Sequence, residues 1–173
     1  MQYQDRSTSE TRWGGAANHY PTLSTEDLCE FSLDLGKGRK RVGDIADDDS
    51  LLFLWATAPM LPEALKVLEA WGFAYKTVAF TWIKRNENVT PVMGMGNWTR
   101  QNAEFCLLGI RGSGVTRKDK SVMSIIETSR LRHSEKPEEA RERIVKLCGD
   151  VPKIELFSRQ QVEGWDYFGN EVG

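Results

Sequence analysis

The sequence predicts an α/β protein with a Rossmann-like, mostly parallel sheet that carries helices on both faces. Two observations lead to this class. Residues 51–84 have the pattern of strand, helix and strand, a crossover of about 34 residues that favours parallel strands. Residues 137–157 have the pattern of an amphipathic helix that leads directly into a strand. At 173 residues, the chain is long enough for one domain with a core of its own, and we expect a single domain over residues 1–173.

The first of these units begins with a continuously apolar run, Leu51 to Trp55. Such a run is typical of a strand that is covered on both faces. Apolar side chains then recur at helical spacing over residues 61–71, and Gly72 is suited to end that helix. Residues 73–84 alternate between larger apolar and smaller side chains, which predicts a second strand.

The second unit begins at Pro137, which suits the first position of a helix because its missing N–H is not needed there. Gly149 is suited to end this helix, and residues 153–157 are expected to form a short strand. Ligands of α/β folds collect at the carboxyl ends of strands. We therefore expect a cleft that contains Glu155, Arg159 and the loop up to Asn170.

The rest of the chain is predicted in less detail. Residues 1–22 are polar and are expected to form a long loop before a helix capped by Ser24 or Thr25. Residues 36–43 are expected to form a basic connection, and residues 104–110 and 122–126 two further strands.

Composition limits the classes of function. The net charge of −2 and the pI near 5.8 argue against strong unaided binding of nucleic acid. Residues 84–132, however, carry nine Lys or Arg against four Asp or Glu, with aromatic residues between them, so a solvated face and a nucleic-acid surface are equally good interpretations. Two histidines and three unpaired cysteines predict no metal site. We expect no membrane span and no secretion signal, and hence a cytoplasmic protein.

Several ordered blocks of the sequence resemble one known family. They are HSEKP (133–137), KIELFSR (153–159), GWDYFGNE (164–171), LLFLWAT (51–57), GNWTRQNAEFCLLGIRG (96–112) and NHYPTLSTEDL (18–28). Together they resemble the MT-A-seventy family of S-adenosylmethionine-dependent N6-adenine methyltransferases. The resemblance implies a class I methyltransferase-like fold, S-adenosyl-L-methionine as the cofactor, and methyl transfer to the exocyclic N6 amine of adenine in DNA or RNA. It leaves open whether the protein forms a homo-oligomer or a hetero-oligomer.

The resemblance also implies roles for particular residues. Lys136 is the expected active-site lysine, near the cofactor or the target base, and Tyr20 is the second expected catalytic residue, as a base-stacking or gating side chain. Read without the resemblance, Lys136 is an exposed lysine before a helix, and Tyr20 is a surface aromatic that anchors its loop. Expected to bind the cofactor are Lys136, Glu155, Arg159, Asn170 and Glu171. Expected to bind the substrate are His19, Tyr20, Arg100, Gln101 and Glu104.

The sequence departs from the family at Gln160-Gln161, where some relatives have His-Asn, and more seriously in a missing motif. Family members carry Asp-Pro-Pro-Trp at the end of a strand that precedes the loop matching residues 2–28, and these 173 residues contain no such motif. We therefore expect an amino-terminally truncated domain with one strand missing, two open strand edges, and little or no methyl transfer by the chain alone.

Two alternatives to a methyltransferase remain. One is a non-catalytic nucleic-acid-binding or partner subunit of a methyltransferase. The other is a nucleotide-dependent α/β enzyme of different chemistry, although the sequence lacks the glycine-rich turn of such sites.

Overall fold

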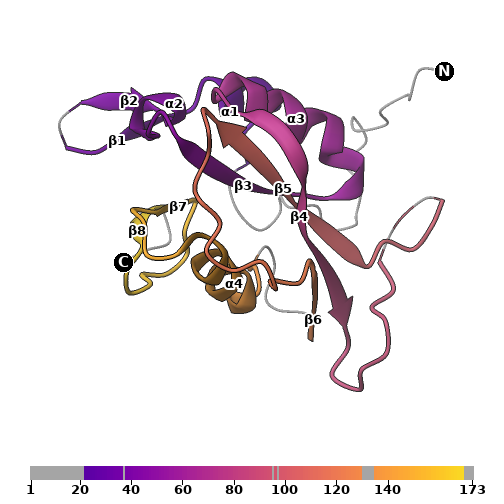
Figure 1. The fold of residues 1–173 in the computed structure, drawn as a ribbon. Coiled ribbons are helices and arrows are strands. Elements are labelled where there is room, and N and C mark those ends of the chain that lie inside the picture. The colour runs from indigo at the N-terminus through magenta and orange to yellow at the C-terminus, as the bar shows by residue number, and fades with distance from the viewer. Residues whose placement is uncertain (1–21, 37, 95, 97, 130–134, 170–173) are drawn as a thin grey trace.

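The computed structural model describes residues 22–36, 38–94, 96, 98–129 and 135–169 (Figure 1). Its largest sheet has four strands in the order β3-β5-β4-β6, which are β3 (Ser50–Ala56), β5 (Ala103–Arg111), β4 (Ala74–Arg85) and β6 (Ile125–Ser129). Two smaller sheets are formed by β1 (Ser32–Asp34) with β2 (Arg39–Arg41), and by β7 (Ile154–Leu156) with β8 (Asp166–Phe168). The helices are α1 (Thr25–Cys29), α2 (Val42–Ile45), the 3-10 helix η2 (Ala58–Met60), α3 (Leu61–Ala70) and α4 (Glu138–Cys148).

The expectation of a mostly parallel sheet is wrong. β5 pairs in antiparallel fashion with both β3 and β4, and only β4–β6 in this sheet is parallel. Because β3 and β4 both run opposite to β5, they run in the same direction as each other, as the crossover through α3 requires. They are not neighbours, however. The chain reverses after β4, and β5 returns between the two strands.

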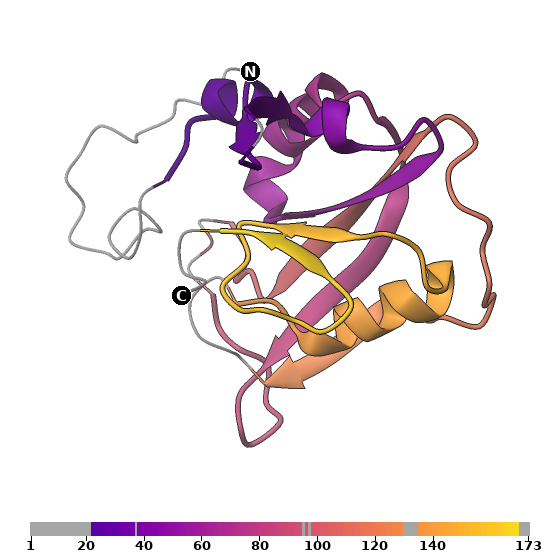
Figure 2. The same cartoon turned by 90° about the vertical axis from the view of Figure 1, so that its left-hand side faces the viewer.

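Helices do cover both faces of the sheet, as predicted (Figure 2). Along β3, Leu52 and Leu54 pack into one core with Leu68 and Trp71 of α3 and its end. Phe53 and Trp55 face the opposite way, into a second core that includes Ala140 and Ile144 of α4. This alternation is the ordinary consequence of the strand pleat, and it gives the continuously apolar β3 a core on each side.

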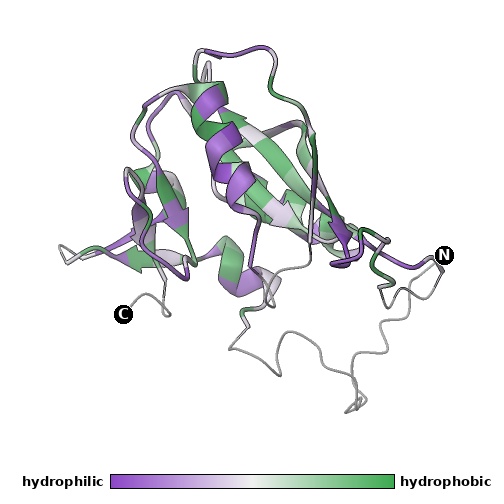
Figure 3. Ribbon diagram, turned by 90° about the horizontal axis from the view of Figure 1, so that it is seen from below, coloured by the Kyte–Doolittle hydropathy of each residue, from purple (hydrophilic) through white to green (hydrophobic). Residues whose placement is uncertain are grey.

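α4 begins and ends close to the predicted positions. Pro137 is the residue that precedes its first turn, and Gly149 ends it with a φ of 79°, a conformation that glycine adopts without strain. Figure 3 shows α4 with a hydrophilic outer side and hydrophobic strands behind it. The strand expected at 122–126 instead begins at Ile125, and the basic connection at 36–43 contributes β2 to a hairpin. No helix among the described residues has the length and apolar character to cross a bilayer.

Among the strand edges that lack a strand partner within the described part of the chain are those of β3 and β7. β3 pairs with β5 alone, and β7 pairs with β8 alone. Nevertheless Leu52 and Leu54 of β3 pack against the same core cluster as Ile154 and Leu156 of β7. The edges of the four-stranded sheet and of the β7–β8 sheet therefore border one hydrophobic core. The single-domain boundary at residues 1–173 stays a prediction.

The central strand β5 should carry much of the stability. Leu107 is 1% exposed within the core under α3, whereas Leu65 on α3 is 40% exposed. Leu107→Ala should lower the free energy of unfolding by about 2–5 kcal/mol, because it leaves a cavity among packed side chains. Leu65→Ala removes the same atoms from a surface position and should change the free energy of unfolding by about 0.5 kcal/mol or less. Urea denaturation of both variants measures the difference, and equal losses would contradict the assigned core.

Candidate active site

A buried carboxylate held between two lysines is the main charged cluster in the described structure. Glu104 is only 9% exposed. Lys136 Nζ donates to Glu104 Oε2 at 2.7 Å, and Lys84 Nζ donates to the other oxygen, Oε1. Each carboxylate oxygen thus has its own ammonium partner. Such a cluster of charges is stable away from water only when its members are paired and hydrogen-bonded, as they are here.

The fold explains why these three side chains meet. Glu104 of β5 lies opposite Trp82 of β4, and Lys84 lies two residues further along β4, on the same face. That face is the one covered by α4, and Lys136 lies two residues before the first residue of α4. The cluster therefore needs the β4–β5 register on one side and the start of α4 on the other.

Two tryptophans lie beneath the lysines. The Lys84 ammonium is 4.7 Å from the centroid of the Trp82 ring, and the Lys136 ammonium is 5.8 Å from that of Trp55. The two rings meet edge to face at 6.4 Å. Both distances lie within the range of a cation–π interaction. The indoles therefore help to fix both ammonium groups above the hydrophobic core.

The electrostatic balance favours an ionised carboxylate. Burial alone would raise the pKa of Glu104, but the charge and hydrogen bond of Lys136, together with those of Lys84, outweigh it and lower that pKa. With one carboxylate and two ammonium groups, the cluster keeps one excess positive charge near neutral pH. That excess can attract an anionic group of a ligand.

Cys106 lies near this cluster but is not a candidate nucleophile. It is fully buried, and burial raises the pKa of its thiol to about 12, against the opposing influence of the Lys136 charge. A thiol with so high a pKa carries almost no thiolate at neutral pH. Cys106 is therefore a packing residue.

The carboxyl end of β7 has a different arrangement. Glu155 accepts a hydrogen bond from Arg141 of α4 at 2.9 Å, so it ties the helix to this strand. Phe157 follows with a φ of 59°, a conformation that is uncommon for a residue with a side chain. Ser158 is 2% exposed, and its hydroxyl donates to the carbonyl of Gln160 at 2.7 Å. The strand thus ends in a tightly bonded turn that presents the exposed Arg159.

Of the residues predicted for the site, the structure brings Lys136 and Glu104 into direct contact. Arg100 and Gln101 lie in the loop that leads into β5, where they bond to Gly96 and Thr99 of the same loop. Glu155 and Arg159 lie at the end of β7. The positions outside the described residues are His19, Tyr20, Asn170 and Glu171.

Lys84 was not predicted as a site residue. Its signal was present, because Lys84 is a lysine that follows alternating Phe80 and Trp82 at the carboxyl end of a strand. A cation on the apolar face of a strand needs a buried partner, and Glu104 was already a candidate.

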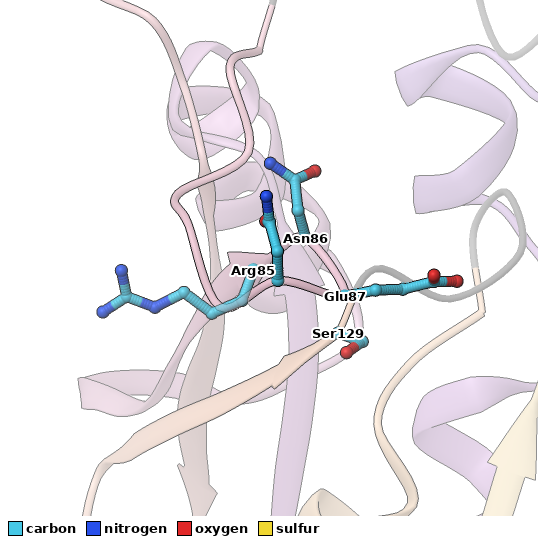
Figure 4. Close-up of a pocket in the computed structure, with 5 residues that line it drawn as sticks. Arg85, Asn86, Glu87 and Ser129 are labelled. Carbon is cyan, nitrogen blue, oxygen red and sulfur yellow. The ribbon is translucent and has the colours of Figure 1, made fainter.

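An open hollow of about 510 Å³ lies beside this region, at the ends of β4 and β6 (Figure 4). It is lined by the polar residues Arg85, Asn86, Glu87, Asn88 and Ser129. Arg85 points to the opposite face from Lys84 and pairs with Glu127 of β6 at 2.9 Å. The hollow is therefore separate from the lysine cluster, although it shares the same strand end.

Comparison with known proteins identifies relatives over most of the chain. The family model of MT-A70 matches residues 39–171. A type II methyltransferase, M.MunI from Mycoplasma sp, is 35% identical over 99% of this chain and 71% of its own length. A probable N(6)-adenosine-methyltransferase MT-A70-like protein from Oryza sativa is 32% identical over 72% of this chain, and human METTL3, an N(6)-adenosine-methyltransferase catalytic subunit, 27% over 88%. The chain spans only 18% and 25% of the last two proteins.

The lowered pKa of Glu104 predicts a specific dependence of stability on pH. A carboxyl whose pKa is lowered by folding stabilises the protein above its unfolded pKa of about 4.3, and this contribution disappears as pH falls through the folded pKa. Glu104→Gln should therefore be most destabilising near pH 7 and progressively less so below about pH 4. Urea denaturation at several pH values measures this. The control Glu69→Gln, at an exposed position on α3, should have little effect at any pH, and a pH-independent cost of Glu104→Gln would contradict the assignment.

Proposed function

Since the chain belongs to the MT-A70 family of S-adenosylmethionine-dependent N6-adenine methyltransferases, we propose that it acts in methyl transfer to the exocyclic N6 amine of an adenine in DNA or RNA. The observation that carries this proposal is the Lys84–Glu104–Lys136 cluster. It supplies a fixed, half-buried positive charge that suits an anionic group on either reactant.

The chemistry demands orientation above all. The lone pair of an adenine amine is delocalised into the ring, so the base must be held with that amine aimed at the methyl group. S-adenosylmethionine supplies the methyl group, on a sulfonium. The protein residues need only bind the two reactants, align them and exclude water.

We assign the main role to Lys136. Its ammonium is held by Glu104 and lies over Trp55, so its position is fixed before any ligand arrives. The excess charge of the cluster fits the carboxylate of the methyl donor, because that group is an anion which needs a fixed cation. Glu104 and Lys84 act through Lys136, as positioning residues.

The other roles rest on the resemblance alone. We propose that Arg159, Asn170 and Glu171 bind the donor, and that Glu155 does so while it also holds Arg141. The base side is assigned to Arg100 and Gln101 together with His19 and Tyr20, and Tyr20 is also assigned a catalytic role.

We further propose that one more strand completes the sheet between β3 and β7. Both strands have an edge without a strand partner among the described residues, and both border the same core cluster. A strand ending in Asp-Pro-Pro-Trp would satisfy those edges and would bring an acceptor carboxylate to the adenine amine. That motif does not occur in the 173 residues.

The test compares methyl transfer by residues 1–173 with methyl transfer by a longer polypeptide that includes the proposed Asp-Pro-Pro-Trp strand. The chain alone should transfer little or no methyl from labelled S-adenosylmethionine, and the longer one should methylate adenine. Parallel reactions on DNA and on RNA identify the substrate. Efficient transfer by residues 1–173 alone would overturn the proposed need for the strand.

Within the longer polypeptide, Lys136→Ala should lower kcat by roughly 100-fold or more, because it removes a preorganised charge from the site. The matched control is Lys66→Ala, which removes a lysine that is exposed on α3, and it should leave kcat unchanged. Undiminished turnover by Lys136→Ala would reject the role of this lysine.

A second candidate function is a non-catalytic partner subunit of a methyltransferase. Calorimetry separates the two. Saturable binding of S-adenosylmethionine that is lost in Lys136→Ala supports the methyltransferase site. No binding by the longer polypeptide supports the partner subunit.

A further inference from the structure

The loop between β4 and β5 presents the most exposed large hydrophobic side chain among the described residues. Trp98 is 91% exposed, although an indole side chain is among the largest apolar surfaces that a protein can bury. A single exposed hydrophobic residue is common and has no meaning by itself. The structure of the loop that carries Trp98 supports a functional interpretation of this exposed side chain.

This loop is anchored on the backbone of Lys84. The N–H of Val92 donates to the carbonyl of Lys84 at 3.1 Å, and the N–H of Lys84 donates to the carbonyl of Asn102 at 2.8 Å. The outgoing and the returning segments of the loop thus both bond to the residue whose side chain holds Glu104. The N–H of Asn86 also donates to the carbonyl of Thr90 at 2.8 Å, which closes the first turn of the loop.

Two glycines allow the loop to pack against itself. A Cβ atom at Gly94 would lie 1.7 Å from the carbonyl oxygen of Gln101, and one at Gly96 would lie 1.8 Å from that of Thr99. No side chain fits at such distances, so the backbone segments approach each other as only glycine permits. The backbone at Gly94 and Gly96 thus packs closely against residues 99–101, yet the indole of Trp98 remains outside this packing.

We propose that Trp98 stacks on a nucleic-acid base that neighbours the target adenine. This inference rests on the proposed function and extends it to how the substrate is held. An enzyme that extrudes a base leaves the adjacent bases without a stacking partner on one side. An aromatic side chain on a fixed loop can replace that partner, and it does so for any base because every base has a π face.

The charge of the segment favours a nucleic acid as the occupant. Residues 88–103 contain Arg100 and not one Asp or Glu, and most of the others are small or amide side chains. A polyanion can therefore approach Trp98 without repulsion from this segment. The root of the loop at Lys84 places Trp98 on the same strand ends as the Glu104 cluster, which is where the proposed chemistry needs the substrate.

The experiment measures binding of fluorescently labelled single-stranded DNA and RNA that contain one adenine, by anisotropy at several salt concentrations. Trp98→Ala should weaken binding roughly 5- to 100-fold, the range expected for one lost stacked base. Trp98→Phe should stay within about threefold of the unchanged protein, because it keeps an aromatic face. The slope of log K against log salt should be the same in all three proteins, because stacking releases no counterions.

Met93→Ala is the matched control. Met93 is 78% exposed on the same loop, but its side chain offers no aromatic face, so this variant should bind as the unchanged protein does. Thermal unfolding should be unaffected by all of these changes, because both side chains are exposed.

Three outcomes would overturn the inference, and they differ in what else they reject. If the unchanged protein binds neither DNA nor RNA, the proposed function fails together with the stacking role. If it binds and Trp98→Ala binds equally well, only the stacking role fails. If Trp98→Ala keeps its affinity for nucleic acid but changes the oligomeric state, measured as the mass of the native protein in solution, Trp98 is a contact to another protein subunit.

Discussion

The pairing of one buried carboxylate with two lysines is the constraint on which the arrangement of the site depends. Removing Glu104 from water is costly unless both of its oxygens are bonded to cations. The register of β4 and β5 brings it to Lys84, and the packing of α4 on the sheet brings it to Lys136. A slip of β5 by one residue would turn Glu104 to the α3 face and break both ion pairs. The cluster therefore specifies the register that builds it, in addition to the hydrophobic pattern of the strands.

The sequence predicted the longer elements, but neither the direction of every strand nor all of the short strands. Leu51 to Trp55, the helix after Pro137 and the stop at Gly149 are confirmed, since each depends on local periodicity or on the conformational preference of one residue. β5 was recognised as a strand, but apolar composition carries no information about direction, so its antiparallel insertion was not foreseen. Similarly, the hairpin of β1 and β2 has exposed Arg39, Lys40 and Arg41 along one strand, and such a run lacks the alternation that indicates a strand.

The composition of β3 and its observed strand pairing disagree. Its seven residues include no charge and no proline, which is the composition of a central strand, yet it pairs on one side only within the described structure. Long apolar edges of this kind attract other strands, and proteins usually protect them with charges or bulges. β3 has no such protection, and the short β7–β8 sheet would be marginal if it stood alone. The strand proposed between β3 and β7 would account for both features.

Lys84 contacts both sides of the proposed site, the donor side through its side chain and the nucleic-acid side through its backbone. Its ammonium holds Glu104, and so fixes Lys136 on the side assigned to the methyl donor. Its backbone N–H and carbonyl anchor the loop that presents Trp98 on the side assigned to the nucleic acid. Lys84 is therefore the residue through which the loop that carries Trp98 is joined to the Glu104 ion pairs. The sequence alone presents it as an ordinary lysine at the end of a strand.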